Sequence, residues 1–419
     1  MLFTALHRLL GLAPGPLNDE MIDAAVAAQL SETDDLDWKG KLIPVKDLPL
    51  SDFPKDVAAM ANRGGGLLVY GVKETEKRAT QRVHVGAFDE RYEAALLSAA
   101  VTAISPPVFN VRAHWVGETG NQVVAVVIPA TSDVPHLIYR GEYFGAPIRN
   151  DAMTVWMKER QVEALYRARF DDRRHSTMAL DNLYDEAATN WTTPQRAWLI
   201  AVAHPQLPFT AFQRPDRHQA REMFQEAIEN TLVYSGSGGV HPLESVEWEN
   251  PRPGLRRWVA PNNALSDSRK WRQSWAAVHH DGSVTLGTGI GGQRTSSGRV
   301  LEEHQIDSMS IEVALSDFMG LVRAASKRLG LAEYDVRVGI RWIGSTPLSI
   351  QTVDGMGFVF NDNSTPLAQY TPVERTVVAD AAPEEFFWQV HDLAEDCINQ
   401  GGVTEVRKIR PPAPKDSEG

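Results

Sequence analysis

The chain has 419 residues, of which 43% are hydrophobic and 23% are charged, and its formal net charge is −12. This length exceeds what one ordinary hydrophobic core occupies, and the composition is that of a folded globular protein, so we expect two domains. The negative charge excludes a protein that coats nucleic acid without specificity, although it leaves room for a local basic groove.

The N-terminal segment predicts a small amphipathic helix. Residues 1–11 are mostly apolar, but the run is short and no signal-peptide cleavage region follows it. No segment of the chain approaches the ~20 consecutive apolar residues that a membrane helix requires. We therefore expect a cytoplasmic protein with no membrane partner.

A capped helix and an acidic strand come next. Residues 18–30 predict a helix, because asparagine stands at the N-cap position and an alanine-rich body follows. Leu36 and Trp38 then alternate with Asp37 and Lys39, which is the pattern of a half-buried strand. The polar face of this strand carries an acid and a lysine two residues apart.

Three consecutive glycines separate a second helix from an apolar strand. Residues 51–61 predict the helix, with Pro54 near its first turn, and residues 67–72 predict a central strand followed by a polar loop over 73–82. The glycines at 64–66 lack the patterns of a P-loop or a dinucleotide-binding turn. We interpret them as a helix C-cap and a tight turn, and we do not expect ATP binding.

The rest of the chain predicts a mixture of helices and strands, hence an α+β fold throughout. In the first half, these elements span 89–104, 108–116, 122–128, 138–140, 146–149 and 157–170. In the second half, they span 217–231, 278–289, 310–329, 336–343, 349–353 and 383–400. The only cysteine, Cys397, lies in the last helical pattern, which indicates a buried thiol and excludes disulfides.

The charged run at 171–176 is poor in apolar residues and predicts the domain boundary. We therefore divide the chain into an N-terminal domain, a second α+β domain of unassigned fold and role, and a disordered tail rich in Pro, Lys, Asp and Ser. These three parts span residues 1–175, 176–407 and 408–419.

Three carboxylates near the N-terminus offer a metal-binding chemistry. Glu32, Asp37 and Glu74 could hold Mg²⁺ or Mn²⁺, since hard cations prefer carboxylate oxygens, and Lys39 could contact a phosphate. Glu32 and Asp37 are five residues apart, so a regular strand would place them on opposite faces. A turn around residues 31–34 is required to bring them together. The alternative is a solvated acidic surface with no chemistry.

These motifs, taken in order, resemble the Schlafen AlbA_2 domain over about residues 20–170. Members usually show Glu-x4-Glu-Phe-Lys, then Ala-x-Ala-Asn-(Thr/Ser)-x-Gly-Gly, an apolar strand and Gly-Val followed by two acids. The corresponding runs here are Glu32-x4-Asp37-Trp38-Lys39 and Ala59-Met60-Ala61-Asn62-Arg63-Gly64-Gly65-Gly66, with Gly71-Val72-Lys73-Glu74 after the strand.

This chain departs from the family pattern at several positions. Asp37 and Glu74 exchange aspartate and glutamate in opposite senses, which keeps the charge and alters the reach. Lys73 replaces the first acid after Gly-Val, and Arg63 replaces a small residue before the glycines.

The resemblance implies a function on nucleic acid. In Schlafen nucleases of this family, three acids form a metal-dependent endoribonuclease centre that cuts tRNA and rRNA. Carried over by motif position, these acids are Glu32, Asp37 and Glu74. Many bacterial members are described only as DNA-binding or ATP-binding regulators.

The leading hypothesis is therefore a metal-dependent endoribonuclease that acts on structured RNA such as tRNA. The alternative is a regulator that binds RNA or DNA without cleaving it. In either case, the basic side chains expected to line a nucleic-acid groove are Lys39, Arg63, Arg140 and Arg149. A homo-oligomer is compatible with the sequence.

Overall fold

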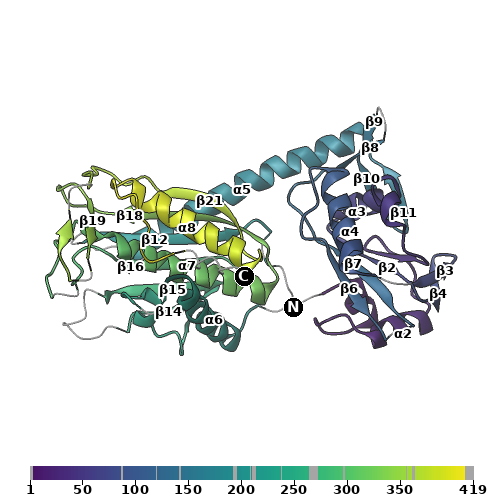
Figure 1. Cartoon of the computed structure of the whole chain (residues 1–419), viewed down its shortest axis with the longest axis horizontal. Coiled ribbons are helices and arrows are strands. Elements are labelled where there is room, and N and C mark those ends of the chain that lie inside the picture. The colour runs from purple at the N-terminus through teal and green to yellow at the C-terminus, as the bar shows by residue number, and fades with distance from the viewer. Residues whose placement is uncertain are drawn as a thin grey trace, which may run out of the picture. The chain divides into compact units, whose positions relative to one another are not determined.

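The computed structural model divides the chain into two compact units, Met1–Arg173 and Arg174–Gly419. Both units mix helices with strands (Figure 1), which confirms the predicted α+β class. None of the helices in the described part of the chain is both long and apolar enough to cross a membrane. The structure describes residues 3–85, 88–118, 120–140, 143–191, 196–207, 209, 214–236, 238–263, 272–295, 298–354, 356–360 and 364–410.

A four-stranded sheet forms the centre of the first unit, in the order β1-β2-β7-β6. The first two strands are parallel, and the other neighbours are antiparallel. The predicted helices at 18–30, 51–61 and 89–104 correspond to α2, α3 and α4. The bounds are α1 Ala5–Leu10, α2 Asp19–Ala27, β1 Leu36–Lys39, α3 Phe53–Ala61, β2 Gly66–Tyr70, α4 Glu90–Thr102, β6 Arg112–Val116 and β7 Val123–Ile128.

Helices cover both faces of this sheet. Leu68 of β2 packs with the residues of α3 and α4, whereas Leu67 packs with those of α1 and α2. Burial on both faces explains why β2 is apolar throughout its length. In β1, Leu36 and Trp38 face α1 and α2. Because side chains alternate along a strand, Asp37 and Lys39 face α3.

The polar segment predicted as a loop over 73–82 is instead a hairpin. Gly71, at φ +101°, ends β2, and the chain continues into β3 (Val72–Thr75) and β4 (Arg78–Arg82). The predicted strand at 67–72 is therefore interrupted. A 3-10 helix, η1 Val45–Leu50, precedes α3. Short strands complete the unit as a three-stranded sheet and a two-stranded ribbon: β5 Ile104–Ser105, β8 Leu137–Arg140, β9 Tyr143–Gly145, β10 Pro147–Asn150 and β11 Met153–Trp156.

The charged run predicted as the domain boundary is helical, and the two units divide within it, after Arg173. The charged run at 171–176 lies inside α5, Glu159–Trp191, and the boundary between the two units falls within this helix. The helix sequence contains no glycine or proline, and charged residues such as Arg and Glu have good helix propensity. The helix predicted for 157–170 therefore continues through the charged run instead of ending before it.

The second unit contains an antiparallel sheet of seven strands in the order β13-β14-β15-β16-β12-β18-β21. Alternate residues of β12 face opposite sides: Leu199 packs with α6, α7 and α8, and Ile200 packs with α5. The bounds are β12 Trp198–Pro205, α6 Arg217–Ser235, η2 Pro242–Ser245, β13 Arg252–Gly254, β14 Arg257–Ala260, β15 Ser274–His279, β16 Val284–Gly289, β17 Gln305–Asp307, α7 Ser308–Leu329, β18 Glu333–Arg341, β19 Ser349–Val353, β20 Val359–Phe360, β21 Val373–Val378 and α8 Pro383–Asn399.

The C-terminal segment is ordered further than the sequence predicts. Glu312, buried in α7, accepts hydrogen bonds through Oε2 from the backbone N–H groups of Arg407, Lys408 and Ile409, and Ile409 is itself buried. The disordered tail predicted for 408–419 therefore does not begin at Lys408, and residues 411–419 lie outside the described part. Cys397 is buried as expected, and burial raises the pKa of its thiol to about 12.

Gly64 and Gly65 form the turn predicted for the three glycines, and Gly66 is the first residue of β2. Gly65 has φ +97°, and a Cβ atom there would lie 2.8 Å from the carbonyl oxygen of Ile128 and 2.9 Å from the nitrogen of Ala130. We expect Gly65→Ala to lower the free energy of unfolding by about 2 kcal/mol or more, from strain and backbone overlap together. Urea unfolding of the full chain measures this change.

Gly64→Ala is the matched control for this prediction. Gly64 has φ +106°, but a Cβ atom there would meet nothing within 4 Å. This variant suffers the backbone strain without the overlap, so it should lose less stability than Gly65→Ala. Equal losses in the two variants would contradict the close approach of the turn to β7.

Candidate acidic site

A tight turn brings Glu32 and Asp37 together. Thr33 and Leu36 exchange both backbone hydrogen bonds, at 3.0 and 3.4 Å, so the chain reverses direction through Asp34 and Asp35. This register sets Glu32 opposite Asp37 as a non-hydrogen-bonded pair, whose side chains lie close on one face. The backbone N–H of Trp38 also donates to Glu32 Oε1 at 3.3 Å.

Two arginines form ion pairs with the aspartates of this turn. Arg8 Nη2 lies 2.6 Å from Asp35 Oδ1, which also accepts the hydroxyl hydrogen of Thr33 at 2.7 Å. Arg63 Nε lies 3.0 Å from Asp34 Oδ2, and 53% of the Arg63 side chain is exposed. Arg63, predicted to contact nucleic acid, is therefore accessible but paired with an acid in this structure.

Glu32 and Asp37 form a buried carboxylate pair with relative exposures of 8% and 3%. Burial raises the pKa of Glu32, and the hydrogen bond and negative charge of Asp37 raise it further, to about 8. Two neighbouring carboxylates cannot both hold a charge cheaply away from water. At neutral pH, Glu32 therefore keeps its proton and shares it with Asp37.

This proton makes the stability of the protein depend on pH. The folded-state pKa of Glu32 lies near 8, above its ordinary value of 4.5, so its contribution is complete below pH 4.5 and is lost as pH rises through 8. Each pKa unit corresponds to about 1.4 kcal/mol. Glu32→Gln stays neutral at every pH, so we expect it to lose less stability than the native protein between pH 5 and pH 9.

Thermal unfolding of the native chain and of Glu32→Gln at pH 5 and pH 9 tests this expectation. The difference in melting temperature between the two proteins should change in favour of the variant as pH rises. Parallel pH profiles would show that Glu32 has no raised pKa in the folded state.

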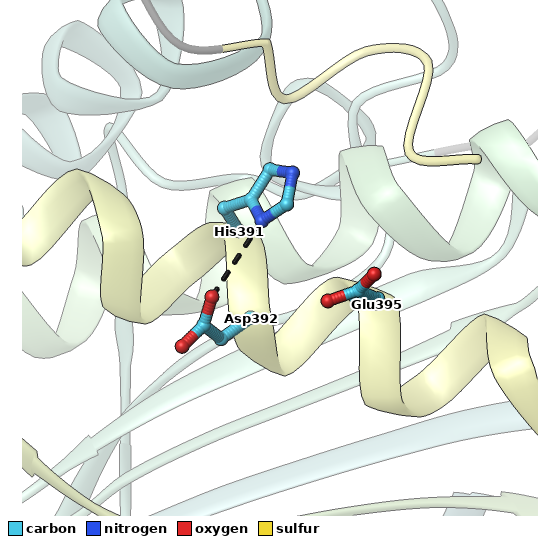
Figure 2. A group of neighbouring side chains, drawn as sticks. All are labelled: His391, Asp392 and Glu395. Carbon is cyan, nitrogen blue, oxygen red and sulfur yellow. Dashed lines mark ion pairs between the residues drawn. The ribbon is translucent and has the colours of Figure 1, made fainter. Parts of the chain in front are cut away.

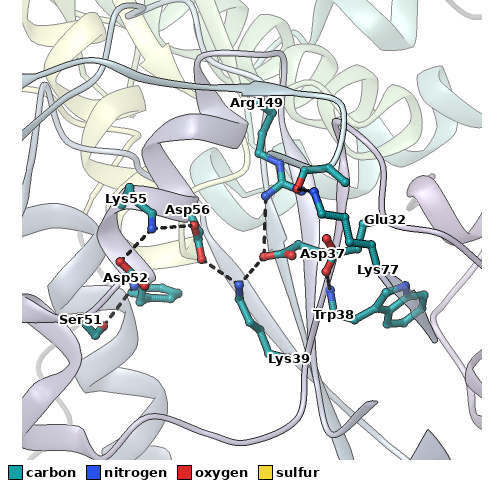
Figure 3. A network of polar contacts seen from close by, with 12 residues as sticks. Glu32, Asp37, Trp38, Lys39, Ser51, Asp52, Lys55, Asp56, Lys77 and Arg149 are labelled. Atoms are coloured by element: carbon teal, nitrogen blue, oxygen red, sulfur yellow. Dashed lines mark hydrogen bonds and ion pairs between the residues drawn. The ribbon is translucent and has the colours of Figure 1, made fainter. Parts of the chain in front are cut away.

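Lys39 lies between two carboxylates from different elements (Figure 3). Its Nζ is 2.7 Å from Asp37 Oδ2 and 3.1 Å from Asp56 Oδ2, the latter on α3. Burial acts to lower the pKa of Lys39, but the negative charges of Asp56 and Asp37 outweigh it, and the net pKa is raised. For Asp56, burial raises the pKa, and the positive charge of Lys39 acts in the opposite direction without cancelling this rise.

The sequence analysis did not select Asp56, although a signal was present. In the helix at 51–61, Asp56 falls on the stripe that also carries Phe53, Val57 and Met60, all of which are buried. An aspartate on an apolar stripe is buried with a cost unless it has a partner. The position of Asp56 on this apolar stripe therefore indicates an ion pair inside the domain.

Arg149 is buried beside Asp37 and does not line an exposed groove as predicted. Its Nη1 lies 3.9 Å from Asp37 Oδ2, and its Nη2 donates to the carbonyl oxygen of Thr33 at 3.3 Å. Arg149 reaches the site from β10, which the sequence places more than a hundred residues from Asp37. The side chain of Arg140, the fourth predicted contact, lies outside the described residues.

Asn62 fixes the position of the strand that carries Arg149. Its Nδ2 donates to the carbonyl oxygens of His136 at 2.9 Å and Pro147 at 2.7 Å, and its Oδ1 accepts the backbone N–H of His136 at 2.6 Å. The asparagine of the Ala-Asn-x-Gly-Gly motif is therefore a buried clamp between the end of α3 and the strands β8 and β10.

Glu74 does not join the carboxylate pair as predicted. It is exposed on β3, beside a register shift between Lys73 and Glu74, and its negative charge is the smallest of the effects that raise the pKa of Glu32. The reason is the break at Gly71, which turns the chain into a separate hairpin. Glu32, Asp37 and Glu74 therefore do not bring three ligand atoms within 4.8 Å of one another in the described structure.

The described residues contain one such group elsewhere, on α8 of the second unit (Figure 2). It consists of His391, Asp392 and Glu395. His391 Nδ1 lies 3.6 Å from Asp392 Oδ1, and Asp392 Oδ2 is 3.3 Å from Arg375 Nη1. All three side chains are partly exposed on neighbouring turns of one helix, and Asp392 already has a cationic partner.

Comparison with known proteins finds a family match within the first unit. Residues 32–158 match the family model described as Schlafen, AlbA_2, which confirms the resemblance read from the motifs. Among curated proteins, none matches this chain.

Two solved structures resemble part of the chain. The DIP2311 protein from Corynebacterium diphtheriae is 16% identical, with a TM-score of 0.25, over 41% of this chain and 34% of that chain. The N-terminal domain of a RecG-related protein from Nitrosomonas europaea is 16% identical, with a TM-score of 0.25, over 34% of this chain and 91% of that domain. The match thus spans about a third of the DIP2311 protein, and neither likeness bears on function.

Proposed function

Because residues 32–158 form a Schlafen AlbA_2 domain, we propose that this chain is a metal-dependent endoribonuclease that cuts structured RNA such as tRNA. The family match indicates a function related to nucleic acid. The observation that carries the finer proposal is the buried Glu32–Asp37 pair with the Lys39 ammonium group beside it. Buried acids with raised pKa values next to a fixed cation are typical of catalytic centres.

The donor chemistry of the pair fits Mg²⁺ or Mn²⁺. Mg²⁺ is usually held by one or two carboxylates, with substrate phosphates and water completing its ligands. Glu32 and Asp37 supply two such carboxylates, so Glu74 is not required as a third. When bound, the ion supplies Lewis-acid stabilisation of charge on the phosphate. Glu32 must release its proton to act as a ligand, so acidic pH opposes this role.

Lys39 acts as a fixed positive charge in this proposal. An ammonium group has three N–H donors, and Asp37 and Asp56 engage two of them, which leaves one for a phosphate oxygen. Its raised pKa keeps Lys39 protonated at neutral pH, so it cannot serve as a general base. Its contribution is to neutralise charge that develops on the scissile phosphate.

The purified full chain tests this function. We expect it to cleave tRNA or rRNA when Mn²⁺ or Mg²⁺ is added, and to lose the activity when EDTA removes the metal. RNA that stays intact with either metal over a range of pH above 8, where Glu32 is ionised, would refute the proposal for these substrates.

The second candidate is a regulator that binds RNA or DNA without cleaving it. The observation in its favour is that Lys39 and Arg149 already neutralise Asp37, while Glu74 stands apart. This candidate predicts binding that weakens with salt and depends on Arg63, with no cleavage under any metal condition. A cytoplasmic location and a homo-oligomeric state stay predictions from the sequence.

A further inference from the structure

The Lys39 ammonium group is held from two sides by buried acids, one on the sheet and one on the helix that covers it. Asp37 precedes Lys39 by two residues on β1, whereas Asp56 lies on α3 and approaches from the opposite side (Figure 3). We propose that Asp56 is a positioning residue, which holds the Lys39 ammonium group beside Asp37 and so fixes the cation of the acidic site.

The surroundings of Asp56 make Lys39 its main partner. Asp56 is 4% exposed on the core side of α3, where an unpaired carboxylate would be strongly unfavourable. The other cation nearby is Lys55, whose Nζ lies 4.0 Å from Asp56 Oδ1. Lys55 is instead closest to Asp52, at 2.8 Å. The 3.1 Å contact with Lys39 is therefore the short ion pair that compensates the burial of Asp56.

The pairing has a consequence for the site. Lys39 keeps 34% of its side chain exposed, so with Asp37 as its only partner the long side chain could rotate toward water. The ion pair with Asp56 restricts this rotation. The remaining N–H donor of Lys39 is then held in a fixed place beside the carboxylate pair. The value of this placement for RNA cleavage rests on the proposed function, but the placement itself does not.

Lysine acylation reports on the two ion pairs, because the amine must leave its carboxylate partners before it reacts. The native full chain is treated with a small amount of acetic anhydride, and the extent of modification at Lys39 and Lys55 is measured by peptide mass spectrometry. Lys55 is the internal control, since its side chain is less exposed than that of Lys39, at 23% against 34%. We expect Lys39 to react at least about tenfold more slowly than Lys55 despite its greater exposure, and equal rates would overturn the proposal.

Asp56→Asn adds a test by substitution, with Asp52→Asn, at the N-cap of the same helix, as the matched control. The Asp56 variant should raise the acylation rate of Lys39 about tenfold, because the ammonium group loses one of the two carboxylates that hold it. The Asp52 variant should leave Lys39 unchanged. An unchanged Lys39 in a folded Asp56→Asn protein would overturn the proposal, and the comparison within the native chain decides the matter if this variant does not fold.

The same variants separate this inference from the proposed function. If the native protein cleaves RNA, Asp56→Asn should lower the cleavage rate and Asp52→Asn should not. If the native protein leaves RNA intact while Lys39 reacts as expected, the endoribonuclease proposal fails and the role of Asp56 stands.

Discussion

Replacing Asp37 by asparagine is expected to reduce metal-dependent RNA cleavage by about a thousandfold or more, because this residue joins every part of the acidic site. Asp37 shares a proton with Glu32, pairs with Lys39 at 2.7 Å and neutralises the buried Arg149 at 3.9 Å. Asparagine keeps the shape of the side chain but removes a metal ligand and the anchor for two cations. Single-turnover cleavage of tRNA with saturating Mn²⁺ measures the loss.

Two controls make this expectation decisive. Asp47→Asn changes an exposed acid of the same unit and should leave the cleavage rate within about twofold, as surface substitutions usually do. Circular dichroism must show that Asp37→Asn is folded, because the variant leaves Arg149 buried without its counter-charge. A folded Asp37→Asn protein with native cleavage would exclude the acidic pair as the catalytic centre.

Local patterns in the sequence were sufficient for the elements that build the site. The alternation of Leu36, Asp37, Trp38 and Lys39 predicted β1, because one face of this strand is apolar and the other polar. The glycines predicted the helix end correctly, since positive φ values leave little choice of residue. The turn before β1 was also predicted, because the five-residue spacing of Glu32 and Asp37 requires one if the two side chains are to meet.

Predictions from the sequence were wrong where contacts between distant segments determine the position of a side chain. Arg149 was expected to line a nucleic-acid groove, but its side chain is buried and donates to the carbonyl oxygen of Thr33 across a separation of 116 positions. Glu74 was placed in the site because the break at Gly71 lies within an otherwise apolar run. These errors have one cause: charge and spacing do not reveal which side chains a tertiary fold buries.

The cations explain how a site of buried acids is tolerated. Asp37 and Asp56 are both buried, and each carboxylate would be costly alone. Lys39 compensates both, Arg149 adds to Asp37, and Glu32 avoids a charge by keeping its proton. The site is therefore balanced without a bound ion at neutral pH. A divalent cation must displace the Glu32 proton, which couples metal binding to pH.

Asn62→Ala is expected to lower the free energy of unfolding by about 3–5 kcal/mol, the largest stability effect we predict for the first unit. The substitution removes three hydrogen bonds and leaves the carbonyl oxygens of His136 and Pro147 and the N–H of His136 buried without their partner. Because Pro147 lies two residues before Arg149 on β10, the loss should also loosen Arg149 from Asp37. Urea unfolding of the full chain measures the first effect.

Asn150→Ala is the matched control, because it changes an exposed asparagine at the end of the same strand and should cost less than about 0.5 kcal/mol. Asn62→Asp sharpens the test, since it keeps the acceptor for His136 but sets a carboxylate against two carbonyl oxygens. It should therefore fail to restore the stability that Asn62→Ala loses. If Asn62→Ala were as stable as Asn150→Ala, the asparagine of the motif would not be a clamp, and the approach of β10 to the acidic pair would need another cause.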